Sequence, residues 1–123
     1  MALPKVHRLK HWREFRAVYR KGICIYGSHL ILRALFFTPE RMQYSNFPTR
    51  IGISISTKVS KKAVQRNLIK RRIRAAFQEL LPRINGGWHI VIVVKNRAVE
   101  CKYVDFLREL EQLLIESKII NGY

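Results

Sequence analysis

A chain of 123 residues is one ordinary domain long, and a content of 48% hydrophobic residues excludes a wholly disordered protein. Its 24 Lys and Arg against 8 Asp and Glu give a formal net charge of +16, whose self-repulsion a polyanionic partner would relieve. Nucleic acid is the expected polyanion, because each phosphate contact releases a counterion, and an anionic membrane surface is the alternative.

The first expected element is a helix over residues 9–20, preceded by a loose basic lead-in at residues 1–8. Aromatic residues recur along this helix at positions i, i+3 and i+7, so they lie on one side of it: Trp12, Phe15 and Tyr19. We expect Trp12 to pack against the rest of the protein. The helix is predicted to end at Gly22, because glycine favours helix C-termini.

Three strands are expected next, at residues 23–26, 30–37 and 50–57, with a polar connector at residues 38–49 before the third. The third strand alternates between apolar and small side chains, with Ile51, Ile53 and Ile55 on one face and Gly52, Ser54 and Ser56 on the other. A face of small residues lets another chain approach closely. We predict that the three strands pair as antiparallel neighbours.

A long helix over residues 61–81 follows, with Ser60 as its expected N-cap and Pro82 at its end. Its apolar side is predicted to enter the core through Ile69, Ile73, Ala76 and Leu80. A strand at residues 88–95 and a helix at residues 103–117 complete the chain, and the apolar stripe of this last helix is Val104, Leu107, Leu110 and Leu114. The order α-β-β-β-α-β-α predicts a single-domain α+β sandwich with helices packed on a four-stranded mixed sheet.

The segment between residues 61 and 74 is densely basic. On a helix, Arg66, Lys70 and Arg74 stand at positions i, i+4 and i+8, on a different side from the apolar residues. Like charges at this spacing repel each other, and no acidic residue relieves them before Glu79. Because guanidinium groups bind phosphate bidentately, the segment predicts a nucleic-acid-binding face, with a merely solvated helix surface as the alternative.

The other reactive residue types show no catalytic or metal-binding pattern. Cys24 and Cys101 lack the spacing of a zinc site and are expected to be two thiols, with a disulfide as the alternative. The acidic residues form no paired-carboxylate motif, and Glu109 and Glu111 are expected on the solvated side of the last helix. No apolar run is long enough to span a bilayer, so a cytoplasmic protein is expected.

The run from Ala63 to Arg74, AVQRNLIKRRIR, resembles the signature of the bacterial ribonuclease P protein family, which commonly contains R-N-R-I-K-R. Similar segments occur in order between about residue 8 and residue 115, namely Glu14-Phe15, Val18 to Gly22, Arg50 to Ser56 and Trp88 to Val94. Leu68 departs from the signature at a position where arginine is most common. Arg72 is expected to replace the phosphate contact that Leu68 does not make.

The resemblance implies a fold with a left-handed crossover between the third and fourth strands. It also implies a function, as the RNA-binding protein subunit of the endoribonuclease that removes the 5′ leader from precursor tRNA. The catalytic RNA would hold the Mg²⁺ ions together with the substrate and would carry the chemistry, so no catalytic residue and no metal site are expected in the protein. The implied partners are the catalytic RNA and precursor tRNA, not DNA or a membrane.

Two surfaces carry the site residues that the resemblance implies. The signature helix would dock on the catalytic RNA through Lys62, Arg66, Asn67, Lys70, Arg71 and Arg74. A cleft between the first helix and the sheet would hold the single-stranded leader through Phe15, Tyr19, Arg33, Ser54, Ser56 and Lys58. For the two aromatic residues, burial in the core is the alternative.

Two other functions fit parts of the sequence. A non-enzymatic RNA-binding protein, such as a ribosomal protein, fits the composition equally well but lacks the signature. A protein with its own nuclease site would need clustered acids, which the sequence does not show.

Overall fold

The computed structural model describes residues 5–36, 48–84 and 86–120. Its regular elements follow the predicted order: α1 (Trp12–Lys21), β1 (Ile23–Tyr26), β2 (Leu30–Phe36), β3 (Arg50–Ser54), α2 (Ala63–Leu80), β4 (Trp88–Val94) and α3 (Tyr103–Glu116). Short 3₁₀ turns lie at Lys5–His7, Leu81–Arg83 and Asn96–Glu100. The predicted α+β class is confirmed, and most of the predicted connector, residues 38–47, lies outside the described residues.

The four strands form one mixed sheet in the order β1-β2-β4-β3. β2 pairs antiparallel with both β1 and β4, whereas β3 pairs parallel with β4. The prediction that β2 and β3 are antiparallel neighbours was therefore wrong, because β4 lies between them. β4 is apolar on both faces and needs two covered faces, so it occupies a central position and leaves the edge to β3. The parallel β3–β4 pair requires the crossover that α2 provides, and its left hand stays a prediction.

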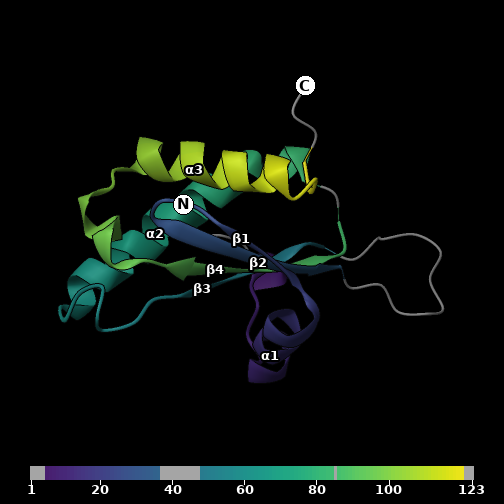
Figure 1. Cartoon of the computed structure of the whole chain (residues 1–123), viewed down its shortest axis with the longest axis horizontal. Helices are drawn as coiled ribbons and strands as arrows, with labels where there is room; N and C mark the ends of the chain where they lie inside the picture. The colour runs from purple at the N-terminus through teal and green to yellow at the C-terminus, as the bar shows by residue number, and fades with distance from the viewer. Residues whose placement is uncertain (1–4, 37–47, 85, 121–123) are drawn as a thin grey trace.

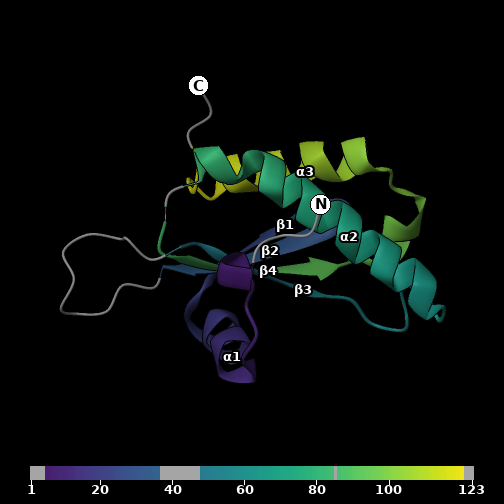
Figure 2. The same cartoon turned by 180° about the vertical axis from the view of Figure 1, so that it is seen from behind.

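The helices cover the two faces of the sheet unequally. α2 and α3 lie together on one face, and α1 lies alone on the other, as Figures 1 and 2 show from opposite sides. The larger hydrophobic cluster fills the α2–α3 side and includes the predicted core residues Ile69, Ile73, Ala76 and Leu80. A smaller cluster under α1 is formed by Leu9, Val18 and Val91, with Phe15, Leu35 and Val93 packed against it.

The N-terminal segment and α1 are tied to the sheet. Arg8 forms a parallel bridge with Ile51, and the backbone N–H of Leu9 donates to the Ile51 carbonyl over 3.0 Å. Residues 5–8 are therefore ordered along the β3 edge, contrary to the expected loose lead-in. α1 begins with a capping box, in which the Arg13 N–H donates to the His11 ring and the His11 N–H donates to Glu14.

Glu109 of α3 does not lie on a solvated face, as was expected. Its carboxylate accepts hydrogen bonds from the backbone N–H groups of His29 (2.8 Å) and Leu30 (2.5 Å), and it lies 2.9 Å from the His29 Nδ1. The carboxylate thus holds the turn between β1 and β2 against α3. The predicted stripe of α3 is correct at Leu110 and Leu114, which are buried, but Val104 is half-exposed.

The start of α2 also differs from the expectation. The N-cap position is Lys62 and has no side-chain cap, so Ser60 is not the N-cap. The Ser60 hydroxyl instead accepts from the Lys62 N–H over 3.2 Å and donates to the Gln65 amide oxygen over 2.5 Å. Ser60 therefore shapes the turn before the helix, which leaves the first N–H groups of α2 without a side-chain cap.

Candidate nucleic-acid interface

The first candidate surface is the α2 face, which we define by Lys62, Arg66, Asn67, Lys70, Arg71 and Arg74. Hydrophobic residues on the opposite side of α2 are buried in the core, so these six polar residues are held on the outer side. Lys62, Asn67 and Arg71 are exposed, and Arg66, Lys70 and Arg74 are partly buried. Helix geometry brings residues three and four apart into neighbouring positions, so the face presents a row of cations.

Two arginines of α2 have additional structural roles. The Arg66 guanidinium donates to the Ser60 carbonyl over 2.8 Å, which fastens the turn that precedes the helix. The Arg72 guanidinium donates to the Cys101 carbonyl over 2.9 Å and so is engaged with the segment that leads into α3. The expectation that Arg72 replaces the missing contact at Leu68 is therefore not supported by its position. Leu68 itself is 39% exposed.

Arg8 is a residue that the sequence reasoning did not assign to this interface. Partial burial of Arg74, and then the nearby charge of Arg8, lower the pKa of the Arg74 guanidinium. The Arg8 Nε is buried without a hydrogen-bond partner among the described residues. The positive potential that these two guanidinium groups share would be relieved by a phosphate beside them. In the sequence, the basic lead-in was the only signal that Arg8 could join this surface. Its position near α2 arises from the bridge to Ile51, which the sequence does not reveal.

The second candidate surface lies between α1 and the sheet, and we call it the α1–sheet surface, defined by Phe15, Tyr19, Arg33 and Ser54. Phe15 rests on Gly52 of β3, where an added Cβ would lie 2.3 Å from the Phe15 Cζ. Phe15 is partly buried and packs against the smaller hydrophobic cluster, so the core alternative describes much of its environment. Gly52 therefore provides the space that the ring occupies.

Tyr19 has a different environment from Phe15. Its side chain is 39% exposed, and the Arg33 guanidinium lies 4.7 Å from the centre of its ring. Arg33 projects from β2, whose neighbours at that point are Cys24 and Val91. A guanidinium over an aromatic ring restricts the motion of both groups, and the pair presents a π face and a positive charge at the same place.

The small-residue face of β3 is shorter than predicted, because the strand ends at Ser54. Ser56 lies beyond it in an exposed turn, where its hydroxyl accepts from the Lys58 N–H over 3.2 Å. Ser54 follows Gly52 on the same side of the strand. Only Gly52 and Ser54 therefore belong to the sheet face under α1, and Ser56 and Lys58 lie at its margin.

Trp12 is not packed into the protein, contrary to the expectation. Its side chain is 60% exposed, its ring stacks on the neighbouring His11 ring, and the Arg13 guanidinium lies 5.5 Å from its centre. Trp12 shares the Tyr19 side of α1 by helical spacing, but it lies with Arg13, Arg16 and Arg20 around a surface depression and not in the hydrophobic cluster under α1.

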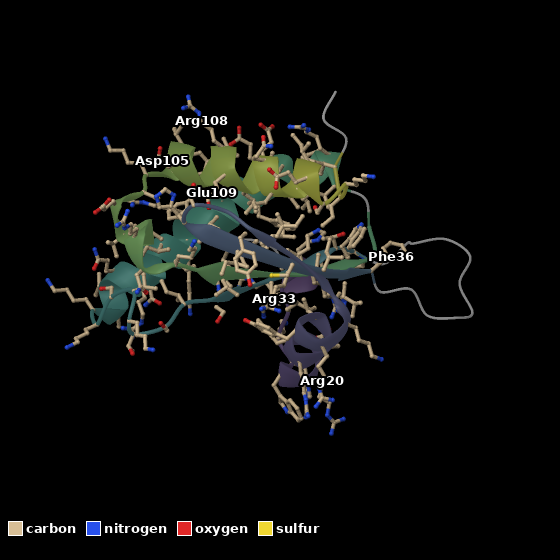
Figure 3. The ribbon with its side chains drawn as sticks, in the orientation of Figure 1. Arg20, Arg33, Phe36, Asp105, Arg108 and Glu109 are labelled. Carbon is tan, nitrogen blue, oxygen red and sulfur yellow. The ribbon has the colours of Figure 1, made fainter. Side chains whose placement is uncertain are left out.

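Most of the acidic residues lie away from these surfaces, although Glu14 belongs to α1 and Glu79 to α2. α3 and the segment before it carry Glu100, Asp105, Glu109, Glu111 and Glu116. Figure 3 shows Asp105 and Glu109 at α3, on the opposite side of the sheet from Arg20 of α1. The single acidic residue of α1, Glu14, is occupied by the His11 N–H and by Arg50 at 3.5 Å. The positive charge of α1 is therefore not neutralised by α3.

The described ranges contain no metal-binding cluster of side chains. Within residues 5–36, 48–84 and 86–120, no three His, Cys, Asp or Glu side chains are placed to hold a metal ion. None of the described helices has the length and apolar character needed to cross a membrane. Cys24 and Cys101 are both free thiols, so the disulfide alternative is not observed. Burial is the main cause that raises the pKa of the Cys101 thiol, and the negative charges of Asp105, Glu109 and Glu100 raise it further. The raised pKa disfavours a reactive thiolate.

Comparison with known proteins gives one consistent result. The family model described as ribonuclease P matches residues 3–118. The "Ribonuclease P protein component" of Picosynechococcus sp. is 54% identical over 123 residues, which is all of both chains, and that of Microcystis aeruginosa is 51% identical over the same span. The solved RNase P protein of Staphylococcus aureus is similar with a TM-score of 0.75 and 27% identity, over 100% of this chain and 98% of that one.

Proposed function

The chain belongs to the ribonuclease P protein family, as the protein component of an endoribonuclease whose RNA carries catalysis, and we propose that its two candidate surfaces bind two different RNAs. The α2 face would bind the catalytic RNA, and the α1–sheet surface would bind the single-stranded 5′ leader of precursor tRNA. The protein would act by supplying positive charge and by holding the leader. The family match leaves the two alternatives, a ribosomal protein and a self-sufficient protein nuclease, without support.

The assignment of the α2 face to the catalytic RNA rests on its charge and its rigidity. Six polar residues are held outward by a helix whose other side is buried, so the spacing of the cations is preset. The charge of Arg8 adds to this row, because it acts on Arg74 from the N-terminal segment that bridges Ile51. A structured RNA is recognised largely through its phosphates, for which a fixed row of cations is suited.

The assignment of the α1–sheet surface to the leader rests on the Tyr19–Arg33 pair, which is the single observation that carries the proposal. An exposed aromatic ring stacks on unpaired bases of any sequence, and a cation at the same place pairs with the backbone. A leader is single-stranded and varies in sequence, so stacking suits it better than base-specific hydrogen bonds. Phe15 would support this surface mainly through its packing on Gly52.

The Mg²⁺ ions of the reaction are proposed to lie on the catalytic RNA and the substrate. The described residues offer no group of three carboxylates, histidines or cysteines for a metal, which supports this placement. We also propose that the protein has no catalytic residue of its own. Cleavage of precursor tRNA by the protein alone, after complete removal of RNA, would overturn this proposal.

The α2 assignment is tested with two adjacent arginines that face different ways. Arg71 is exposed on the α2 face, whereas Arg72 donates to the Cys101 carbonyl. Arg71→Ala combined with Lys70→Ala should weaken binding to the catalytic RNA and leave the melting temperature nearly unchanged. Arg72→Ala should lower the melting temperature and leave the affinity of the folded protein unchanged. Equal affinity losses in both variants would show that the face is assigned wrongly.

The leader assignment is tested with two exposed tyrosines. Tyr19→Ala removes a ring from the α1–sheet surface, and Tyr26→Ala, the matched control, removes a 69% exposed ring from β1. Bound to the catalytic RNA, the Tyr19→Ala protein should lose about 1–3 kcal/mol of affinity for precursor tRNA and none for mature tRNA, which has no leader. The control should lose neither. If Tyr19→Ala weakens the two RNAs equally, the leader does not contact this ring.

A further inference from the structure

The outer side of α1 begins at the flank that Trp12 shares with Tyr19 and turns away from the sheet toward Arg20, and it carries a shallow depression. The depression has a volume of about 340 Å³ and is lined by Trp12, Arg13, Arg16, Ala17, Arg20 and Lys21. The residues around it are one large aromatic residue, one small residue and four basic residues, and the basic residues line it mainly through their aliphatic stems. Trp12 is 60% exposed, so its indole ring is accessible to a ligand from solution.

The cations of this outer side have no acidic partner among the described residues. Glu14 is the single acid of α1, and its carboxylate turns toward Arg50 and the start of the helix. Arg16 and Arg20 are one helical turn apart, at a spacing where like charges repel and weaken the helix. Figure 3 shows Arg20 pointing away from the body of the molecule. A negatively charged ligand would relieve this repulsion.

The outer side is continuous with the α1–sheet surface. Trp12 and Tyr19 are seven residues apart, nearly two full helical turns, so they lie along the same flank of α1. Tyr19 adjoins Arg33 on the sheet, and Trp12 adjoins Arg13 on the outer side. The two aromatic residues are each paired with a guanidinium at similar distances, 5.5 Å for Trp12 and 4.7 Å for Tyr19. A strand that passes Tyr19 therefore reaches Trp12 next.

We propose that the outer side of α1 binds single-stranded RNA, and that this RNA is the part of the leader farther from the cleavage site than the part held at Tyr19. Trp12 stacks on an unpaired base, and Arg13, Arg16 and Arg20 pair with phosphates. This inference rests on the proposed leader binding at the α1–sheet surface. A duplex region of the catalytic RNA is a poorer fit, because its bases are already stacked and do not need an exposed indole ring.

The test uses the full chain assembled with its catalytic RNA and a series of precursor tRNAs whose leaders are lengthened one nucleotide at a time. Affinity should rise with leader length in two stages. Tyr19→Ala should remove the first stage, and Trp12→Ala should remove only the second, with a loss of about 5- to 150-fold for the longest leaders. Trp12→Phe should retain most of the second stage, because a phenyl ring also stacks.

A second variant tests the cations, and a third provides a direct signal. Arg16→Ala combined with Arg20→Ala should reduce the salt slope of binding by about 1.4 for long leaders and leave it unchanged for short leaders. In a Trp88→Phe background, Trp12 is the sole indole of the chain. Its fluorescence should change when a long-leader precursor binds and stay constant with a short-leader precursor.

Several results would overturn the inference. A loss in Trp12→Ala that is equal for all leader lengths and for mature tRNA would exclude the distal leader as the ligand. Weaker binding of this variant to the catalytic RNA alone would assign the outer side to that RNA instead. No loss at any leader length would leave Trp12 without a role in RNA binding. A different result would refute the α1–sheet assignment, namely a Tyr19→Ala variant that keeps the first stage of binding. The two failures are distinguishable, because one concerns short leaders and the other concerns only long leaders.

Discussion

Gly52→Ala tests how α1 is seated on the sheet. The added Cβ would lie 2.3 Å from the Phe15 Cζ and 2.5 Å from the Phe15 Cε1, where ordinary carbon contacts are about 3.5–4.0 Å. It would also lie 3.3 Å from the Leu9 Cβ, so Leu9 limits the space that remains. The Phe15 ring must therefore move by about 1 Å or more, and overpacking of this kind costs about 1–3 kcal/mol.

The expected result is a lower melting temperature with a specific rescue. For a domain of this size, each kcal/mol of destabilisation lowers the melting temperature by roughly 3–6 °C. Phe15→Leu removes the part of the ring that collides, so Gly52→Ala should be less harmful in that background. A double-mutant cycle by urea denaturation should therefore give a favourable coupling of about 0.5–3 kcal/mol between the two positions.

The same pair also separates packing from RNA binding. Displacing Phe15 should weaken precursor tRNA binding in the assembled enzyme, because the ring and the nearby Tyr19 share one helix face. Arg71 and the rest of the α2 face lie across the sheet from this change, so affinity for the catalytic RNA should fall much less, and only through Arg8, which adjoins Leu9 and bridges Ile51. Strictly additive stabilities for Gly52→Ala and Phe15→Leu would refute the reasoning, since the two side chains would then not compete for the same space.

Three further outcomes are expected. Glu109→Ala should lower the free energy of unfolding by about 1–3 kcal/mol in a urea titration, because it leaves the His29 and Leu30 N–H groups without their acceptor. The control Glu111→Ala breaks a half-exposed ion pair with Arg83 and should cost about 0–1 kcal/mol in the same titration. Burial lowers the pKa of His89 below its ordinary 6.5, so the unfolded chain binds a proton more tightly than the folded protein does. The free energy of unfolding should therefore fall as the pH drops below about 6.5 toward the lower pKa of the folded state. His89→Gln should lose this part of the pH dependence, and an unchanged profile would contradict the assignment. Affinity for the catalytic RNA should fall by about 10³-fold or more between about 50 and about 200 mM salt, as measured by filter binding, because the chain carries a formal charge of +16, and a flat salt dependence would contradict a phosphate-dominated interface.

Much of the fold was accessible from local patterns. The 3.6-residue period identified three helices, and the two-residue period and apolar runs identified four strands, with ends within a few residues of those observed. The core side of α2 was predicted correctly because Ile69, Ile73 and Ala76 recur at helical spacing and all three are buried. Misplaced boundaries, such as the early end of β3 at Ser54, occur where a strand loses its pairing partner and not where its residue pattern changes.

The errors concern contacts between residues far apart in the sequence. β3 pairs with β4 because β4 is apolar on both faces and so takes a central position in the sheet. This choice depends on comparing all four strands, and the pattern of one segment does not reveal it. In the sequence, Glu109 resembles any solvated acidic residue of a helix. Only the fold brings it into contact with the turn at His29, which lies 80 residues earlier in the chain. Arg72 belonged to the same basic run as Arg71, yet the neighbouring Cys101 carbonyl engages one and not the other.

The sequence alone determined the class of the protein, because charge density, helical period and the signature at Arg66 to Arg74 are properties of composition and order along the chain. Only the tertiary structure decided how the cations and aromatic rings are divided among surfaces. It buried part of Phe15 over Gly52, left Trp12 exposed, and brought the charge of Arg8 near enough to act on Arg74. The physical reason is that exposure and charge pairing depend on where other segments lie, and those positions follow from the packing of the whole domain.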